Sequence, residues 1–332
     1  MLTRRSFLKA GSSTLILSSR PLSAQGGAIK RYSIIASKAS HRLGRPGTSP
    51  TPLWLYNGQS PGPLIEANRG DTLEVAFTNN LEVPTTIHWH GIRNLNEMDG
   101  VPDLTQSAVE PGKTFTYSFP LHESGTYWYH AHTKGWEQMA RGLYGALVVK
   151  EKRSKSANDI VLVADDWRLT EDYKLDEDSF GSLRDWSHQG RLGNWLTING
   201  STEPIIDVSP GVARLRLINA ANARSLNFRL GNNQRPEIVA LDGAPCDPFK
   251  VDTIKLAPAQ RVDLLLELND EEVKLEEVST GDVLPAAYLK VSGNALPPIV
   301  PTDIVRDRKP NKKDAKARKS RCLDRLILAP PN

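Results

Sequence analysis

The sequence predicts an all-β protein that consists of two tandem β-sandwich domains. Three observations lead to this prediction: a length of 332 residues, many short runs rich in β-branched and aromatic residues, and the lack of a helix-length amphipathic window. Since a domain commonly has about 100–200 residues, this length indicates about two domains. Short strands separated by Gly, Pro, Asn and Asp are typical of sandwiches and barrels.

The first predicted domain spans residues 28–150. Apolar and polar residues alternate in residues 72–77, which is the pattern of a strand with one buried face. Four further runs have strand-like composition and lie between turn-forming residues. These strand candidates are Thr85–His90, Phe115–Phe119, Thr126–His132 and Leu143–Val149.

The second predicted domain spans residues 158–292 and follows a polar hinge at residues 151–158. Its strand candidates are Ile160–Val163, Ala213–Ile218, Arg261–Glu267 and Ala287–Val291. Residues 171–194 are polar and show little periodicity. A long loop is therefore expected there.

Composition excludes several classes of protein. Apolar residues make up 39% of the chain and charged residues 24%, which is typical of a globular protein. Beyond the first twenty or so positions, no apolar run approaches the roughly 18 residues needed to span a bilayer, so no transmembrane segment is expected. Residues 306–321 carry nine basic and two acidic residues, and the remainder of the chain is slightly acidic. We therefore expect residues 293–332 to be a disordered basic tail, and no nucleic acid partner.

The first 24 residues have the order of a signal peptide. Arg4 and Arg5 precede a weakly apolar segment at residues 10–19, and cleavage is expected after Ala24. Adjacent arginines in this position are typical of a twin-arginine signal. This pattern predicts a bacterial protein that the twin-arginine export machinery delivers to the periplasm. That compartment permits disulfides, but we expect Cys246 and Cys322 not to pair, because Cys322 follows the basic run.

Four of the seven histidines form two His-x-His pairs, His88/His90 and His130/His132. Side chains alternate between the faces of a strand, so the two imidazoles of each pair should project from the same face. If the strands are neighbours, all four imidazoles can converge. Imidazole binds copper, zinc, iron and nickel, so the pattern predicts a metal site without naming the metal, and a catalytic zinc site is an alternative.

Seven short motifs follow one another in the first predicted domain: NGQSPGP at 57–63, GDT at 70–72, IHWHG at 87–91, DGVP at 99–102, EPG at 110–112, GTYWYHAH at 125–132 and GLYG at 142–145. Their order and spacing resemble the first domain of multicopper oxidases, the laccase-like enzymes. The second domain resembles the middle domain of the family through ING at 198–200, RLINA at 216–220, ALDG at 240–243 and LAPAQRVD at 256–263. The resemblance implies cupredoxin-like Greek-key sandwiches over residues 30–292.

The resemblance also implies copper as the cofactor and a reaction that couples oxidation of a reductant to reduction of dioxygen to water. By position, His88 would bind the type 2 copper, and His90, His130 and His132 would bind the type 3 pair. Asp99 would lie near the cluster, where a carboxylate can relay protons. A simple role for Asp99 in an Asp-Gly turn is an alternative.

The sequence departs from the family at the site of electron entry. Blue copper needs a cysteine with nearby histidines, but Cys246 and Cys322 have none within fifty residues, and no histidine follows His188. In the family, the last domain supplies the remaining pairs. We therefore expect a truncated oxidase that is inactive alone and whose reductant is unknown, with a separately encoded last domain as a possible partner. The alternatives are an exported copper-binding module and a non-catalytic cell-envelope protein.

Overall fold

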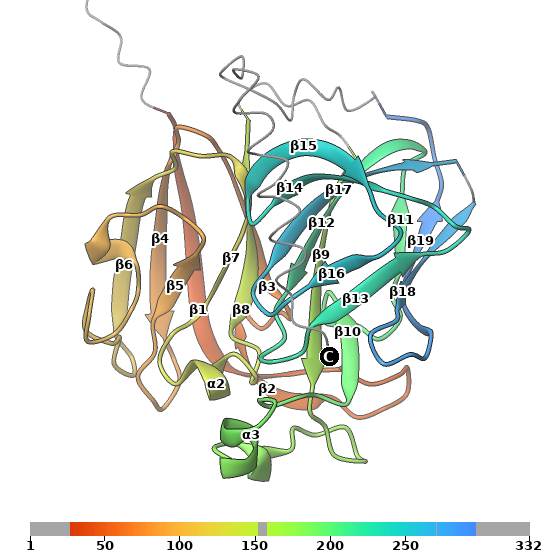
Figure 1. Ribbon diagram of the computed structural model, residues 1–332. Helices are drawn as coiled ribbons and strands as arrows, with labels where there is room; N and C mark the ends of the chain where they lie inside the picture. Colours follow the sequence, from red (N-terminus) through yellow and green to blue (C-terminus); the bar gives the residue numbers. More distant parts are fainter. Residues whose placement is uncertain (1–26, 152–157, 270, 297–332) are drawn as a thin grey trace, which may run out of the picture.

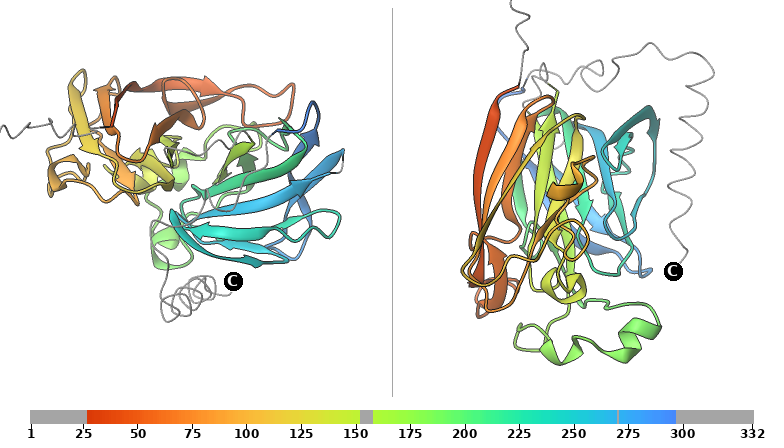
Figure 2. Two further views of the ribbon diagram at one scale, coloured as in Figure 1. Left: turned by 90° about the horizontal axis from the view of Figure 1, so that it is seen from above. Right: turned by 90° about the vertical axis from the view of Figure 1, so that its left-hand side faces the viewer.

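The computed structural model describes residues 27–151, 158–269 and 271–296. These residues form two β-sandwiches that lie side by side (Figures 1 and 2). The predicted all-β fold class with two tandem sandwiches is confirmed. The expected signal peptide, Cys322 and the tail beyond Leu296 lie outside the described residues.

The first sandwich packs a sheet of order β2-β1-β4-β6 against a sheet of order β3-β8-β7-β5. Its strands are β1 (Ile29–His41), β2 (Thr51–Tyr56), β3 (Gly62–Asn68), β4 (Thr72–Asn79), β5 (Ile87–His90), β6 (Thr114–Pro120), β7 (Gly125–Ala131) and β8 (Tyr144–Lys150). The parallel pairs β1–β4 and β3–β8 join strands that are not consecutive in the chain. Both sheets therefore hold together segments distant in sequence.

The second sandwich packs a sheet of order β10-β9-β12-β17-β14-β15 against a sheet of order β11-β19-β18-β13-β16. Its strands are β9 (Asp159–Trp167), β10 (Trp195–Ile198), β11 (Ile205–Val208), β12 (Gly211–Asn219), β13 (Leu226–Leu230), β14 (Glu237–Leu241), β15 (Ala244–Lys250), β16 (Ile254–Leu256), β17 (Arg261–Leu268), β18 (Glu272–Glu277) and β19 (Leu284–Val291). Cys246 lies in the core of this sandwich.

Each sandwich has its own hydrophobic core, and a third apolar cluster lies between them. The alternation predicted in β4 is confirmed, since Leu73, Val75 and Phe77 are all fully buried. The third cluster joins Trp128 and Tyr144 of the first sandwich to Trp167 of the second. The two sandwiches thus share an apolar interface.

Strand β7 is buried along its whole length. Its residues Tyr127 and Tyr129 contribute to the core of the first sandwich, whereas Trp128 contributes to the cluster between the sandwiches. Since neighbouring side chains in a strand point in opposite directions, β7 has apolar partners on both faces. This strand also carries His130.

Several predicted boundaries differ from the structure. The strand predicted to start at Thr85 starts at Ile87, because Thr85 instead forms an isolated bridge with Val109. The strand predicted to end at His132 ends at Ala131. The helical segments of the described residues are one-turn elements: η1 (Asn96–Met98), α2 (Gly135–Gln138), η2 (Glu177–Ser179) and α3 (Leu183–Ser187).

The expected long loop at residues 171–194 contains η2 and α3, and α3 projects below the sandwiches in Figure 1. Across the described part of the chain, no helix is long and apolar enough to cross a membrane.

Candidate metal centre

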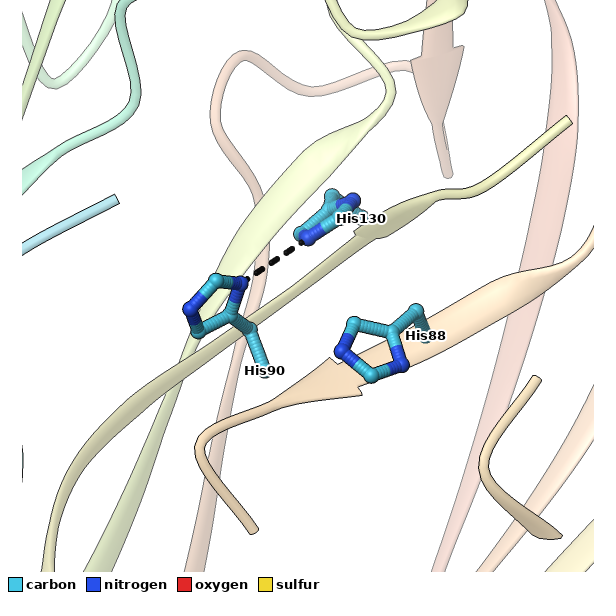
Figure 3. Close-up of side chains that lie close together, drawn as sticks. All are labelled: His88, His90 and His130. Atoms are coloured by element: carbon cyan, nitrogen blue, oxygen red, sulfur yellow. Dashed lines mark hydrogen bonds between the residues drawn. The ribbon is translucent and has the colours of Figure 1, made fainter. Parts of the chain in front are cut away.

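Two antiparallel strands bring the His-x-His pairs together. Strands β5 and β7 pair in a register that sets His88 opposite His130 and His90 opposite Trp128. Residues opposite each other in a register share a face of the sheet, so the alternation expected from the sequence places these imidazoles on one side. Figure 3 shows the His88, His90 and His130 rings turned toward a common volume.

Three imidazoles form a compact group of potential ligands. One ring nitrogen from each of His88, His90 and His130 lies within 4.8 Å of the others. Nδ1 of His90 is 3.3 Å from Nε2 of His130 (Figure 3). Two nitrogens bound to one metal ion through bonds of about 2.0 Å have a similar separation. The pair therefore fits a shared metal ion.

His132 lies beside this group. It follows the last residue of β7 and is exposed. Its ring centroid is 5.2 Å from that of His88 and 6.2 Å from that of His130. The structure thus brings all four predicted histidines together, with three in the tight cluster and the fourth at its open side.

Backbone carbonyl oxygens orient two of the imidazoles. Nδ1 of His130 lies 2.9 Å from the carbonyl oxygen of Ala131, and Nδ1 of His88 lies 2.7 Å from that of Asp99. A neutral imidazole that donates its Nδ1 proton to a carbonyl leaves a lone pair on Nε2. Such contacts fix the tautomer and ring direction of metal-binding histidines.

Asp99 lies next to His88. It follows η1, and its Oδ1 is 3.6 Å from Nδ1 of His88. The following Gly100 has a φ of 78°, and a Cβ at that position would lie 1.7 Å from the carbonyl oxygen of Ile87. The Asp-Gly turn therefore packs closely against β5. The position of Asp99 agrees both with a role as a turn residue and with a role as a carboxylate beside the cluster.

The protein environment favours neutral imidazoles. Burial lowers the pKa of His90 to about 3, and the nearby Arg261, His88 and His132 lower it in the same direction. Burial also holds the pKa of His130 well below its usual value and lowers that of His132. The neutral imidazole is the form that binds a metal ion, so these ligands need not lose a proton to do so near neutral pH.

Trp128 forms the inner wall of the site. Its ring centroid is 4.4 Å from that of His130 and 5.1 Å from that of His90. The side chain is almost fully buried between the sandwiches. The sequence spacing indicates that Trp128 is part of the site, because Trp128 lies two positions before His130 and therefore on the same face of the strand.

The second sandwich contributes Arg261 to the surroundings of the site. Its guanidinium lies against Gly91, the residue after His90, where a Cβ would be 2.3 Å from Nη2 of Arg261. Its Nε donates to the carbonyl oxygen of Thr126 on β7 at 3.3 Å. No local pattern in the sequence indicates this contact, since Arg261 and Thr126 are 135 residues apart.

A buried network of ion pairs stabilises the same region. Arg216 of β12 binds the carboxylate of Asp159 and lies 3.1 Å from that of Asp263 on β17. Asp263 also accepts a hydrogen bond from the hydroxyl of Thr126 and pairs with Arg214. Arg216 and Asp263 are almost completely buried, so each depends on its partners.

Comparison with known proteins gives consistent matches. Two family models, both described as multicopper oxidase, match residues 39–154 and 158–274. A multicopper oxidase of Staphylococcus haemolyticus is 31% identical over 280 residues, covering 80% of this chain and 60% of the relative. Cell division protein FtsP of Proteus mirabilis is 29% identical over 299 residues, covering 81% of this chain and 61% of the relative.

Among solved structures, a multicopper oxidase from Pseudomonas thermotolerans superposes with a TM-score of 0.76 at 34% identity. The match covers 85% of this chain and 69% of that one. The chain thus spans about 60% of the length of the two curated relatives.

Proposed function

The chain belongs to the multicopper oxidase family, and we propose that it binds copper through His88, His90, His130 and His132 as the first-domain half of a laccase-type centre. The observation that carries the proposal is the 3.3 Å separation between Nδ1 of His90 and Nε2 of His130. The donor set supports it, since imidazole suits copper. Catalytic zinc would bind the same donors, and the family membership favours copper.

We assign His88 to a type 2 copper and His90, His130 and His132 to a type 3 pair. The support for this division is that His90 and His130 face each other, whereas His88 lies opposite His130 with its Nδ1 directed to Asp99. Bound copper would supply one-electron redox chemistry for the reduction of dioxygen.

The chain's own residues would orient the ligands and handle protons. The carbonyl oxygens of Ala131 and Asp99 hold the rings of His130 and His88, and the ring of Trp128 covers one side of the His90/His130 pair. The partly exposed carboxylate of Asp99 can hold a proton or a water molecule beside His88. Its role would be proton transfer between solvent and the centre.

Oxidation of a reductant by the whole protein is part of the proposal. The 332 residues contain no cysteine–histidine motif of the blue-copper type. We infer that turnover requires ligands beyond those in these 332 residues, seated over the open side of the cluster. The paired arginines at Arg4 and Arg5 support export to the periplasm through the twin-arginine machinery.

A copper-binding role without turnover is a second candidate. It is favoured by the tight group of three imidazoles, which can hold an ion without a further domain. A purely structural role, by analogy with a cell division relative, has less support because all four histidines are present. Oxidase activity of the chain alone and after addition of a last domain from a relative would separate these candidates.

Copper titration tests the premise that both candidate functions share, which is that the chain binds copper. The purified chain should bind copper tightly, and His90→Ala and His130→Ala should lose affinity by at least about tenfold. His188→Ala is the matched control, because His188 is an exposed histidine at the end of α3. Equal binding by all four proteins would refute the proposal.

A further inference from the structure

Three large apolar side chains are exposed on two short helices at one end of the molecule (Figure 1). Trp136 of α2 is 37% exposed, and Leu183 and Trp186 of α3 are 83% and 68% exposed. The ring centroids of Trp136 and Trp186 are 6.1 Å apart, and Leu183 lies one helical turn before Trp186. We call these three side chains the aromatic patch. Contiguous apolar surface of this kind is typical of an interaction site.

The segment that carries α3 is anchored, so the exposure of its apolar side chains does not result from a loose loop. The guanidinium carbons of Arg141 and Arg191 lie 4.6 Å and 4.5 Å from the ring centroid of Phe180. Nη1 of Arg168 donates to the carboxylate of Asp185, within α3, at 2.9 Å. These contacts hold α3 in place while its two large apolar side chains face solvent.

The chain contains a short apolar segment outside the described residues. Residues 323–328 have the sequence LDRLIL, in which four of the six side chains are large and apolar. Only Cys322 separates this segment from the basic run at 306–321. Removal of such side chains from water is favourable. The segment therefore offers apolar surface that can cover the aromatic patch.

The connecting chain is long enough to reach the patch. The carbonyl oxygen of Leu296 lies 4.0 Å from the position of a Cβ on Gly211, at the start of β12. Strand β9 runs parallel to β12 and ends at Trp167, so the segment with α3 leaves from the opposite end of the sheet. The nine residues of β9 cover about 30 Å, whereas the 26 residues at 297–322 can span about 85 Å.

Charge favours the same pairing. Among the exposed side chains of residues 168–191, four are acidic and two are basic. The acidic ones are Glu171, Asp172, Glu177 and Asp178. The run at 306–321 has nine basic and two acidic residues, so opposite charges would lie together when the apolar segment is bound. Exposed ion pairs each contribute little, so the apolar contact would provide most of the affinity.

We propose that residues 323–328 bind to the aromatic patch of the same chain, with the basic run as a tether beside the acidic side chains. A tethered segment has a high effective concentration, which favours binding within one chain over binding to a second copy. The basic run itself would keep the disorder that its composition predicts. The proposal does not depend on copper binding, because it uses none of the four histidines.

Cys322 provides a probe next to the apolar segment. Benzophenone maleimide attached to Cys322 of the full chain would crosslink on irradiation to the residues nearest to it, while Cys246 is buried in the core. Mass spectrometry of the digested protein should place the main crosslinks at residues 183–186 and Trp136, with a yield independent of protein concentration. Crosslinks spread evenly over the surface, or crosslinks that join two chains, would overturn the proposal.

Trp186→Ser should lower the crosslink yield summed over α2 and α3 at least about fivefold, because it removes a large part of the apolar contact. Ile205→Ser is the matched control, because Ile205 is 67% exposed on β11, outside the patch. Equal yields in these two variants would contradict docking at the patch. If Trp186→Ser does not fold, as judged by circular dichroism, Leu183→Ser should act in the same direction and decides. Lys316→Glu combined with Lys319→Glu should also lower the yield, and no decrease would refute the role of charge.

Discussion

Nδ1 of His90 lies 3.3 Å from Nε2 of His130, although the two residues are 40 positions apart in the chain. The contact exists because β5 and β7 are adjacent antiparallel strands. The hydrogen-bonded framework of the sheet therefore sets the spacing of the two ligands. Such preorganisation reduces the entropy cost of binding.

The first prediction concerns the unequal roles of the histidines. His130→Ala should lower the affinity for the first equivalent of copper by at least about tenfold, whereas His132→Ala should lower this affinity less. The reason is that His130 belongs to the tight group and His132 lies at its exposed side. Isothermal titration of both variants would measure this, and a larger loss in His132→Ala would contradict it.

Trp128 should report on metal binding. Its ring lies beside both His90 and His130, so a copper ion held by these imidazoles should quench its fluorescence. Titration with copper should therefore quench part of the emission of the seven tryptophans. Trp128→Phe should bind copper but lose that component of the quenching. Equal quenching in both proteins would place the ion elsewhere.

The buried ionic network should be important for stability. Arg216→Ala removes the arginine that pairs with Asp159 and one of the two arginines that pair with the buried Asp263, which should cost about 3–5 kcal/mol in the free energy of unfolding. Arg229→Ala, in an exposed pair, should cost less than about 1 kcal/mol. Urea denaturation would provide both values. Similar losses would show that the network contributes no more than a surface pair.

A buried carboxyl group should make stability depend on pH. Burial holds the pKa of Asp165 well above its usual value, with Asp166 adding to the effect. Because the folded pKa exceeds the unfolded one, the folded state keeps its proton to higher pH, and stability falls as pH rises between the two values.

Asp165→Asn removes this titration. The difference in Tm between Asp165→Asn and the unmodified chain should therefore increase with pH above about 4, the unfolded value. Thermal unfolding of the metal-free proteins across a range of pH values would test this. A difference that stays constant, or that shrinks as pH rises, would contradict the expected direction.

Part of the site could be predicted because its signal is local. A His-x-His spacing on a strand determines that both imidazoles share a face, and the β-rich composition around each pair indicates strands. The pairing of β5 with β7 brought the two pairs together as expected. The pattern could not predict that β7 ends at Ala131, because the strand ends where its pairing with β5 and β8 ends.

Other features depend on contacts between the sandwiches and leave no local pattern. Arg261 begins a Leu-rich run that is typical of a strand, and only the packed interface places it against Gly91. The same holds for Arg216, whose partners come from three separate segments of the chain. Long-range pairs of this kind are set by tertiary packing, which overrides local preference.

Because β7 is buried on both faces, the positions of the ligands depend on the register of this strand. One face supplies Tyr129 to the first core, and the other presents His130 to the site. Inserting a single residue before Tyr127 would exchange the faces, driving an imidazole into the aromatic core and a phenol ring toward the ligands. Length changes in this strand should therefore be forbidden in evolution.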